Sequence, residues 1–532
     1  MPKSKISRLA MFSALSTLAF AAPTSAQSVV GSGVPASTVS NSAERPIAFA
    51  VQAPADAGLI ILMQSAELPD IPALSPAERS AVEAAIASAE FKGKTGTNLK
   101  LRGIGNRPLI MLAGAAQPDK AGPEDAGLDW KSAAGSAVQK LMKEGSELAI
   151  VGAPDAAAMA EAALGLDLGQ YRFDRYQTDV ETAPAAQSVT IAGPSASAAQ
   201  ALWNNRYKHL ADSVRMVRDL QSEPANTLYP QSFVERVSAA FKGVPNIRIE
   251  VLDEAAMRKM NMGAIVGVGQ GSPRGSRMMV VSYTGGTGAP LALAGKGITF
   301  DTGGISIKPN KGMWAMKADM SGAAAVMGTT LSLAKSRAPV NIVAVAALAE
   351  NMPGANAQRP GDVVRTYGGK TIEILSTDAE GRLVLADAVQ YVADRYKPFA
   401  LVDIATLTGS VGRAVGDQYA GLFAREDEIA DRLLKAAEDS GEHLWRLPLH
   451  PAYAKAIRSD IADVKNSGVT DAPGASAGAH FIGYFIDESM PWAHLDIAGV
   501  DWNNSAKPLT PKGASGFGVR LLDQLARDWT AK

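Results

Sequence analysis

Cysteine is absent from the 532-residue chain. That absence excludes disulfide bonds, thiolate metal ligands and a lipoprotein anchor, and it suits an oxidising export compartment without proving one. Histidine is scarce, with five residues in the whole chain. None of them forms the HExxH arrangement, which excludes the common histidine-based zinc peptidases.

Neither sign of charge predominates, since 52 basic residues face 53 acidic ones and the formal net charge is −1. A basic excess or a polybasic tract would indicate nucleic acid or an anionic membrane surface as a partner, and neither is found. We therefore expect no nucleic-acid partner. The apolar content of 47% and the charged content of 20% fit a globular protein.

Long apolar runs are also missing, and the most apolar terminal stretch is short. Residues 1–26 have the pattern of a secretory signal peptide, in which basic residues precede the mostly apolar Leu9–Ala22 and small residues follow up to Ala26. We predict cleavage before Gln27, giving an exported protein, periplasmic or secreted, without a stable membrane anchor. The alternative is an N-terminal anchor, but a bilayer needs about 20 apolar residues to be spanned.

The length predicts two domains, and no internal repeat is found. We interpret residues 27–45 as a linker, 46–194 as a smaller α/β domain, 195–220 as a connecting helix and 221–532 as the larger domain. In the smaller domain, strands are predicted at Ile47–Val51, Leu59–Leu62, Leu109–Leu112 and Leu148–Val151, and helices at Pro76–Phe91, Trp130–Glu144 and Asp155–Leu164. The connecting helix is predicted at Ser195–Leu220.

The larger domain has strand patterns separated mostly by helical ones. They lie at Ile247–Val251, Met278–Tyr283, Leu291–Ala294, Ile342–Ala347, Thr371–Leu375, Phe399–Ile404 and His494–Ile497. The fold class predicted is therefore α/β, with a parallel or mixed C-terminal sheet flanked by helices on both faces.

One charged stretch stands between a predicted strand, Thr371–Leu375, and a predicted helix. It contains Asp378, Glu380 and Arg382. In open α/β sheets, ligands bind where strands end and helices begin. The alternative interpretation is that the two carboxylates only cap the helix.

A second stretch favours the functional interpretation. Lys296 and Asp301 follow the apolar run Leu291–Ala294, Lys308 comes soon after, and Asp319 opens a helical pattern. Together the two stretches place four carboxylates at comparable positions. Carboxylates brought close together repel one another unless positive charge neutralises them, and two divalent cations would do so.

Three motifs then resemble one family. GKGITFDTGG (295–304), MKADMSGAAAV (316–326) and STDAEGRL (376–383), in this order and spacing, are similar to those of the leucyl aminopeptidase family of two-metal peptidases. The resemblance runs roughly from residue 222 to residue 522. Ser376 stands where that family usually has asparagine, and Thr302 where it has serine, but neither is an expected ligand.

The resemblance implies a two-metal hydrolase, with 221–532 as the catalytic metallopeptidase domain. It implies two zinc or manganese ions per subunit, with Asp301 and Glu380 bridging them; the full set of ligands would be Lys296, Asp301, Asp319, Asp378 and Glu380. It also implies that Lys308 stabilises the oxyanion and that Arg382 holds a bicarbonate ion acting as general base. For Lys308, the alternative is an ordinary solvated loop lysine.

The same resemblance implies peptide substrates with a free N-terminus and a homohexamer. Met316, Thr406 and Gly409 match positions that line the family's pocket for the first side chain. An apolar methionine there suits leucine or another apolar residue. The alternative for Met316 is ordinary core packing.

Two rival functions can be tested against the sequence. The segment 474–478 reads GASAG, which fits a serine-hydrolase elbow, and His480 is close by. That elbow needs a preceding strand, whereas Asp471-Ala472-Pro473 is typical of a turn. The second rival is DNA binding, because some members of the leucyl aminopeptidase family bind DNA as regulators. The net charge of −1 and the predicted export both argue against that role for this chain.

Overall fold

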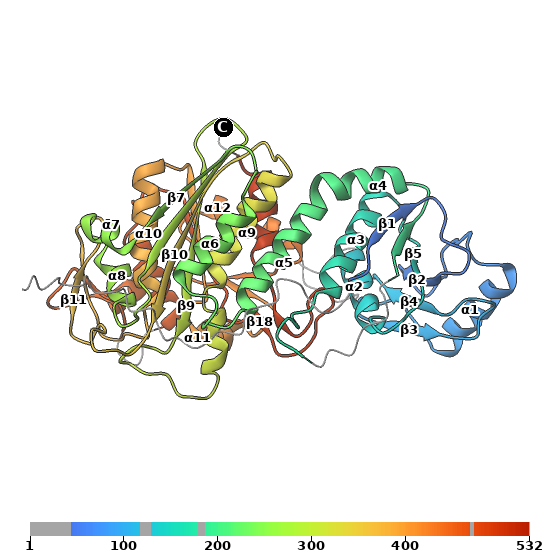
Figure 1. The fold of residues 1–532 in the computed structure, drawn as a ribbon, viewed down its shortest axis with the longest axis horizontal. Coiled ribbons are helices and arrows are strands. Elements are labelled where there is room, and N and C mark those ends of the chain that lie inside the picture. Colours follow the sequence, from blue (N-terminus) through green and yellow to red (C-terminus); the bar gives the residue numbers. More distant parts are fainter. Residues whose placement is uncertain (1–43, 117–128, 179–186, 469–472, 531–532) are drawn as a thin grey trace, which may run out of the picture.

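The computed structural model describes residues 44–116, 129–178, 187–468 and 473–530. It shows two lobes joined by a long helical segment (Figure 1). The predicted signal peptide and nearly all of the predicted linker lie outside the described residues. Within the described ranges, no helix is both long and apolar enough to cross a membrane.

The N-terminal lobe is built on a six-stranded sheet with the order β1-β6-β5-β2-β4-β3. All neighbours pair in parallel except β3, which is antiparallel to β4. The strands are β1 (Ile47–Ala50), β2 (Gly58–Met63), β3 (Asn98–Leu101), β4 (Ile110–Gly114), β5 (Leu148–Val151) and β6 (Val189–Ala192). The helices are α1 (Pro76–Ser88), α2 (Trp130–Lys140) and α3 (Ala156–Gln170).

Strand alternation explains why this sheet carries helices on both faces. Ile61 of β2 packs in one core with α1, whereas Ile60 and Leu62 pack in another with α2 and α3. Successive side chains of a strand point to opposite faces, so a fully apolar strand needs a helix on each side. The four strands predicted in this lobe are present; β3 and β6 had not been predicted.

The connecting segment is helical throughout, as predicted. It consists of α4 (Ala196–Leu202), one π-helical turn η2 (Trp203–Tyr207) and α5 (Lys208–Ser222). Figure 1 shows α5 running from the N-terminal lobe along the larger lobe. The π turn was not predicted, because one extra residue in a turn leaves little trace in hydrophobic periodicity.

The larger lobe is organised around an eight-stranded mixed sheet with the order β15-β14-β17-β13-β9-β10-β8-β7. Its central strands β17, β13, β9 and β10 are parallel. The strands are β7 (Ile247–Leu252), β8 (Arg277–Thr284), β9 (Leu291–Asp301), β10 (Asn341–Asn351), β13 (Ala400–Ala405), β14 (Ala420–Ala424), β15 (Leu444–Arg446) and β17 (Trp492–Asp496). The α/β fold class with helices on both faces is thus confirmed.

Helices cover both faces of this sheet. One apolar core joins it to α5, α9, α12 and α14, and another joins it to α8, α10 and α13. The helices are α6 (Pro230–Ala240), α7 (Glu254–Lys259), α8 (Gly263–Gly269), α9 (Ser321–Lys335), α10 (Gly381–Tyr396), α11 (Gly409–Val415), α12 (Asp427–Ser440), α13 (Gly474–Gly483) and α14 (Val519–Asp528), with 3₁₀ turns η3 (Met313–Ala318) and η4 (Pro451–Ile457).

Two predictions about strands need correction. The run Thr371–Leu375 forms only β12 (Thr371–Glu373), which pairs with β11 (Val363–Arg365) and β16 (Val464–Lys465) in a separate small sheet. It is too short and too polar to join the buried main sheet. A further small sheet pairs β18 (Trp502–Asn503) with β19 (Gly513–Ala514).

The second correction concerns β9, which was expected to end at Ala294 and instead continues to Asp301. It stays paired with β10 beyond Lys296, with one register shift near Ala349. Lys296 therefore lies within the strand and not after it. The glycines on each side of Lys296 do not end the strand, because its backbone hydrogen bonds to β10 continue.

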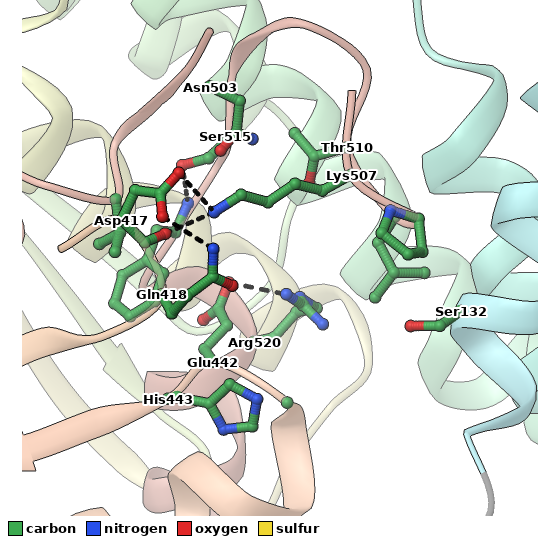
Figure 2. A pocket seen from close by; sticks show the side chains of 15 residues that line it. Ser132, Asp417, Gln418, Glu442, His443, Asn503, Lys507, Thr510, Ser515 and Arg520 are labelled. Carbon is green, nitrogen blue, oxygen red and sulfur yellow. Dashed lines mark hydrogen bonds and ion pairs between the residues drawn. The ribbon is translucent and has the colours of Figure 1, made fainter. Parts of the chain in front are cut away.

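A cavity of about 170 Å³ lies where the two lobes meet. Figure 2 shows Ser132 of α2 on one side and residues of the larger lobe on the other. Its two cationic side chains are both paired, because Lys507 contacts Asp417 and Arg520 contacts Glu442. The cavity thus belongs to the junction of the lobes and offers no free charge to a substrate.

Candidate metal centre

The five predicted metal ligands converge at one end of the central strands. Lys296 and Asp301 come from β9, Asp319 directly precedes Met320 and α9, and Asp378 and Glu380 precede α10. Parallel strands bring their carboxyl ends to one edge of the sheet, and the helices that follow begin there. Lys296 and Glu380, 84 positions apart in the sequence, are thereby placed in contact.

Lys296 is the buried centre of this cluster. Its Nζ lies 2.9 Å from Asp319 Oδ1 and 2.9 Å from Glu380 Oε1, and it donates to the Thr406 carbonyl at 2.8 Å. Burial alone would lower the pKa of Lys296, but these two carboxylates raise it above its usual value. A divalent cation in the cluster would therefore have to displace the lysine proton before the amine could act as a ligand.

Gly381, the first residue of α10, leaves room for Lys296. A Cβ atom at this position would lie 2.5 Å from Lys296 Cε. Any side chain here would therefore push the lysine away from the carboxylates. This close approach explains physically why a glycine follows Glu380.

Lys308 neutralises the other side of the cluster. Its Nζ lies 2.8 Å from Asp301 Oδ2 and 2.5 Å from Asp378 Oδ1. Burial would lower its pKa, yet Asp301 and Glu380 raise it above the usual value. The chain returns to this point through a turn in which Gly303 has a φ of +86° and the Lys308 amide donates to the Thr302 carbonyl at 2.8 Å.

Asp301 is held in place from behind by a residue that sequence reasoning missed. Asn351, the last residue of β10, donates from Nδ2 to Asp301 Oδ1 at 2.7 Å and to the Thr377 carbonyl at 3.0 Å. It therefore links the Asp301 strand to the Asp378 loop. The sequence offered one indication of this role, since Asn351 is a polar residue at the end of a long apolar strand. Burial, with Glu380 nearby, raises the pKa of Asp301 to about 6.

The donor set fits divalent cations. Asp301, Asp378 and Glu380 each offer a carboxylate oxygen within 4.8 Å of the others. Asp319 Oδ2 and Glu380 Oε2 are buried and, among the described residues, have no hydrogen-bond partner. A buried unpaired carboxylate oxygen is costly, and a bound cation would relieve that cost. Oxygen ligands with one amine nitrogen suit zinc or manganese.

Arg382 lies in the first turn of α10 and is buried. Its Nη1 donates to the Asn466 carbonyl at 2.8 Å, whereas its Nε has no partner among the described residues. Burial lowers its pKa, against the opposite effect of Glu380 and Asp496. Asn466 also accepts from the Leu375 amide at 2.8 Å, so it fixes the loop that carries Asp378.

The three predicted pocket residues lie around the cluster but differ in their contacts. Met316 is half-buried on η3, and Gly409 is exposed at the start of α11. The hydroxyl of Thr406 lies 2.6 Å from Asp319 Oδ1 and donates to it. Its side chain therefore orients a candidate ligand, and no contact in the structure tests its predicted role towards substrate.

The alternative interpretations of these motifs can be compared with the structure. Glu380 is the N-cap residue of α10, but its side chain makes no capping hydrogen bond. Ser476 lies inside α13 and donates to the Pro448 carbonyl at 3.2 Å, while His480 contacts the His450 carbonyl. Within the described residues, no strand leads into this serine and its hydroxyl is not paired with His480. The segment is therefore a helix and not a nucleophile elbow.

Comparisons with known proteins identify the family of the chain. The model of the cytosol aminopeptidase family catalytic domain matches residues 215–523, and that of the family's N-terminal domain matches residues 66–180. A probable cytosol aminopeptidase of Caulobacter vibrioides is 44% identical over 500 residues, which cover 90% of this chain and 97% of the relative.

Two solved structures share the two-lobed fold. A mutant of tomato leucine aminopeptidase superimposes with a TM-score of 0.80 at 28% identity, covering 93% of this chain and 99% of that one. The bottromycin maturation enzyme BotP, in complex with Mn, gives a TM-score of 0.77 at 30% identity, covering 89% and 99%. The chain therefore belongs to the cytosol aminopeptidase family and is a metallo-aminopeptidase that uses two divalent cations.

Proposed function

We propose that the chain is an exported aminopeptidase that removes N-terminal residues, leucine or other apolar ones, from peptides. The observation that carries the hydrolytic function is the buried cluster in which Asp319 and Glu380 each keep an unpaired oxygen beside Lys296. Such a cluster is unstable without cations and has no evident structural purpose.

Two divalent cations, when bound, supply a more acidic water and polarise the peptide carbonyl. We assign their binding to Lys296, Asp301, Asp319, Asp378 and Glu380, with Asp301 and Glu380 shared. With cations bound there, Lys308 would no longer be needed to neutralise Asp301 and Asp378. Its ammonium is free to donate a hydrogen bond to the carbonyl oxygen of the substrate and to stabilise the negative charge that develops there.

Arg382 is proposed to hold a small oxyanion such as bicarbonate. The support is the buried Nε of Arg382, which lacks a partner among the described residues. A planar anion could bind to it through charge-assisted hydrogen bonds. A bicarbonate there would accept a proton during water attack and return it to the leaving amine.

The experiment that tests the hydrolytic function is a substrate panel run before and after metal removal. Leucine, alanine and arginine amides are offered to the parent, to the chelated protein and to the protein reloaded with zinc, manganese or magnesium. We expect chelation to abolish hydrolysis and reloading to restore it. Hydrolysis that survives complete chelation and falls with a serine-directed inhibitor would contradict the proposal.

Export rests on the signal-like pattern of residues 1–26 and on the absence of cysteine. The test is the N-terminal sequence of the protein recovered from an extracytoplasmic fraction. Export predicts a chain beginning at Gln27. A full-length chain found only in the cytoplasm would overturn this part of the proposal.

The family resemblance is the support for a homohexamer, and light scattering should then give about six chain masses. The net charge of −1 supports the absence of a nucleic-acid partner. Salt-sensitive DNA binding by the purified protein would revive the regulatory alternative.

A further inference from the structure

Asp501 is an ionisable residue that the proposed mechanism does not use. It follows β17 in the loop that leads into β18, and it is half-buried. Among the described residues, none forms an ion pair with its carboxylate. Its backbone is fixed, since its amide donates to the Ile497 carbonyl at 3.1 Å and its carbonyl accepts from Ser515 at 3.0 Å.

The loop that carries Asp501 is packed against η3, the turn that bears Met316. The ring of Trp502 lies 6.0 Å from that of Trp314, and Lys317 Nζ lies 5.4 Å from the Trp502 ring. Trp314 and Lys317 flank Met316 along η3. The residue next to Asp501 is therefore in contact with the turn predicted to line the pocket for the first side chain.

The same loop touches α11, which begins at Gly409. A Cβ atom at Gly499 would lie 2.5 Å from the Gly416 carbonyl oxygen and 3.2 Å from Gly412 Cα. The loop backbone thus lies directly on this helix. Asp501 is consequently placed between the two elements that carry Met316 and Gly409.

The surroundings of the Asp501 carboxyl disfavour its charged form. Burial raises the pKa of its carboxyl to about 7, while its own backbone amide and Lys296 lower it and Asp496 raises it. The Asp501 side chain is thus partly shielded from solvent.

Buried aspartates with a structural task look different in this chain. Asp387 accepts from the Ile265 amide at 2.9 Å and from the Tyr367 amide at 2.8 Å. Asp496 accepts from the Thr408 hydroxyl at 2.7 Å and from the Leu407 amide at 3.1 Å. No described residue outside its own loop holds the Asp501 carboxylate in this way, so it is available to a ligand.

We propose that Asp501 determines specificity at the first side chain, selecting lysine and arginine. This inference rests on the proposed aminopeptidase function, and it replaces leucine with lysine and arginine as the preferred first residue. The aliphatic stem of the basic residue lies along Met316, and its cationic end pairs with Asp501. A leucine side chain would cover Met316 equally well but leave the carboxylate desolvated and unpaired, which is costly.

The test compares side chains that differ only in charge. The metal-loaded protein hydrolyses amides of lysine and norleucine, which share a four-carbon stem, and of arginine and citrulline. We expect kcat/KM to be about tenfold or more higher for each charged member, a ratio typical of a close charge pair away from bulk water. Asp501→Asn removes the charge at almost constant volume and should bring both ratios close to one.

Controls separate selectivity from folding. Asp431→Asn changes an exposed carboxylate on α12 and should leave both ratios as in the parent. Asp501→Met should favour norleucine over lysine while keeping two metals per chain. If the Asp501 variants do not fold, the kcat/KM ratios of the parent still test the proposal. Equal kcat/KM values for the lysine and norleucine amides would overturn it.

The failure of this inference is distinguishable from failure of the proposed function. Amides hydrolysed with unchanged ratios in Asp501→Asn would refute the role of Asp501 alone. No hydrolysis of any amide by the metal-loaded parent would instead refute the aminopeptidase function on which the inference rests.

Discussion

Lys296 and Lys308 both contact carboxylates of the cluster, yet their surroundings give them different tasks. The Lys296 side chain is 4% exposed and is fixed by three oxygen atoms, whereas the Lys308 side chain is 21% exposed and comes from a loop. A buried amine at the centre of the oxygens is placed to bind an ion. A partly exposed ammonium at the edge is placed to meet a substrate.

Lys308→Ala should therefore retain both metals and lose most of its turnover. The charge on the substrate oxygen grows in the transition state, so losing the donor lowers kcat more than it weakens binding. Removal of one such donor costs about 10²–10³-fold in kcat. Steady-state kinetics with elemental analysis measures this, and Lys311→Ala, an exposed neighbour, is the control. Parental turnover with two metals bound would show Lys308 to be an ordinary loop lysine.

Gly381→Ala should weaken metal binding without touching a ligand. The added methyl group would meet Lys296 Cε and displace the amine. We expect at least a tenfold rise in the metal dissociation constant, in the range found when a ligand's support is lost (about 10–100-fold). In the double variant with Lys296→Ala the glycine change should add little, because its target is gone. Additive effects of the two substitutions would contradict this explanation.

Among the elements, α10 links the site to the core through one buried carboxylate. Asp387 is fully buried and accepts amide hydrogens from α8 and from the loop before β12. These contacts hold the helix that begins beside Glu380. The helix is buried on nearly all sides along its first three turns. The sequence pattern predicted only one buried face for it.

Asp387→Ala should destabilise the protein, because it leaves the Ile265 and Tyr367 amides buried without acceptors. The expected loss is about 1–3 kcal/mol for each unpaired donor. Thermal or urea unfolding of the metal-loaded protein measures it. Asp431→Ala, exposed on α12, is the comparison and should change little. A melting temperature for Asp387→Ala equal to that of the comparison variant would contradict the assigned role.

At this scale the sequence predicts more of the main sheet than of its surroundings. Apolar runs such as Met278–Tyr283 and Ile342–Ala347 were identified because buried strands are apolar throughout. Short strands such as β15 and β3 were missed, because so few residues give no distinct alternation. β9 was predicted too short, because a lysine flanked by two glycines is not typical of the interior of a buried strand. The carboxylates that pair with Lys296 come from distant parts of the sequence.

The candidate ligands could be predicted from motif and charge, but their supports could not. Asn351 and Asn466 lie far from the motifs in sequence, and only the fold brings them behind Asp301 and Arg382. Likewise, the hydrogen bond from the Thr406 hydroxyl to Asp319 was not predicted, and the predicted role of Thr406 in lining the pocket stays a prediction. Such contacts depend on the register of packed elements, which local patterns do not contain.

In the whole molecule, the two lobes are joined by more than a linker. Arg218 of α5 is fully buried and donates to the carbonyl groups of Leu168 at 2.8 Å, Leu509 at 3.0 Å and Ser515 at 3.0 Å. One guanidinium thus connects the N-terminal lobe, the connecting helix and the C-terminal loop. Gln139 of α2 adds contacts to the Lys507 and Pro508 carbonyls.

Arg218→Met should loosen this junction, since a methionine keeps the volume but offers no donor to three buried carbonyls. We expect destabilisation of several kcal/mol, given about 1–3 kcal/mol for each group left unsatisfied. Hydrogen exchange should increase in α3 and near Leu509. Arg432→Met, on the surface of α12, is the matched control. Unchanged exchange in both segments would show that Arg218 does not join the lobes.

The central claim is that one cluster binds two cations and that Asp301 and Glu380 belong to both sites. Elemental analysis of the chelated and reloaded protein tests it most directly. The parent should bind two zinc or manganese ions per chain and hydrolyse leucine amide, whereas Asp301→Ala and Glu380→Ala should each lose metal and activity together. Two full equivalents of metal in either variant, after the same reloading, would contradict the account.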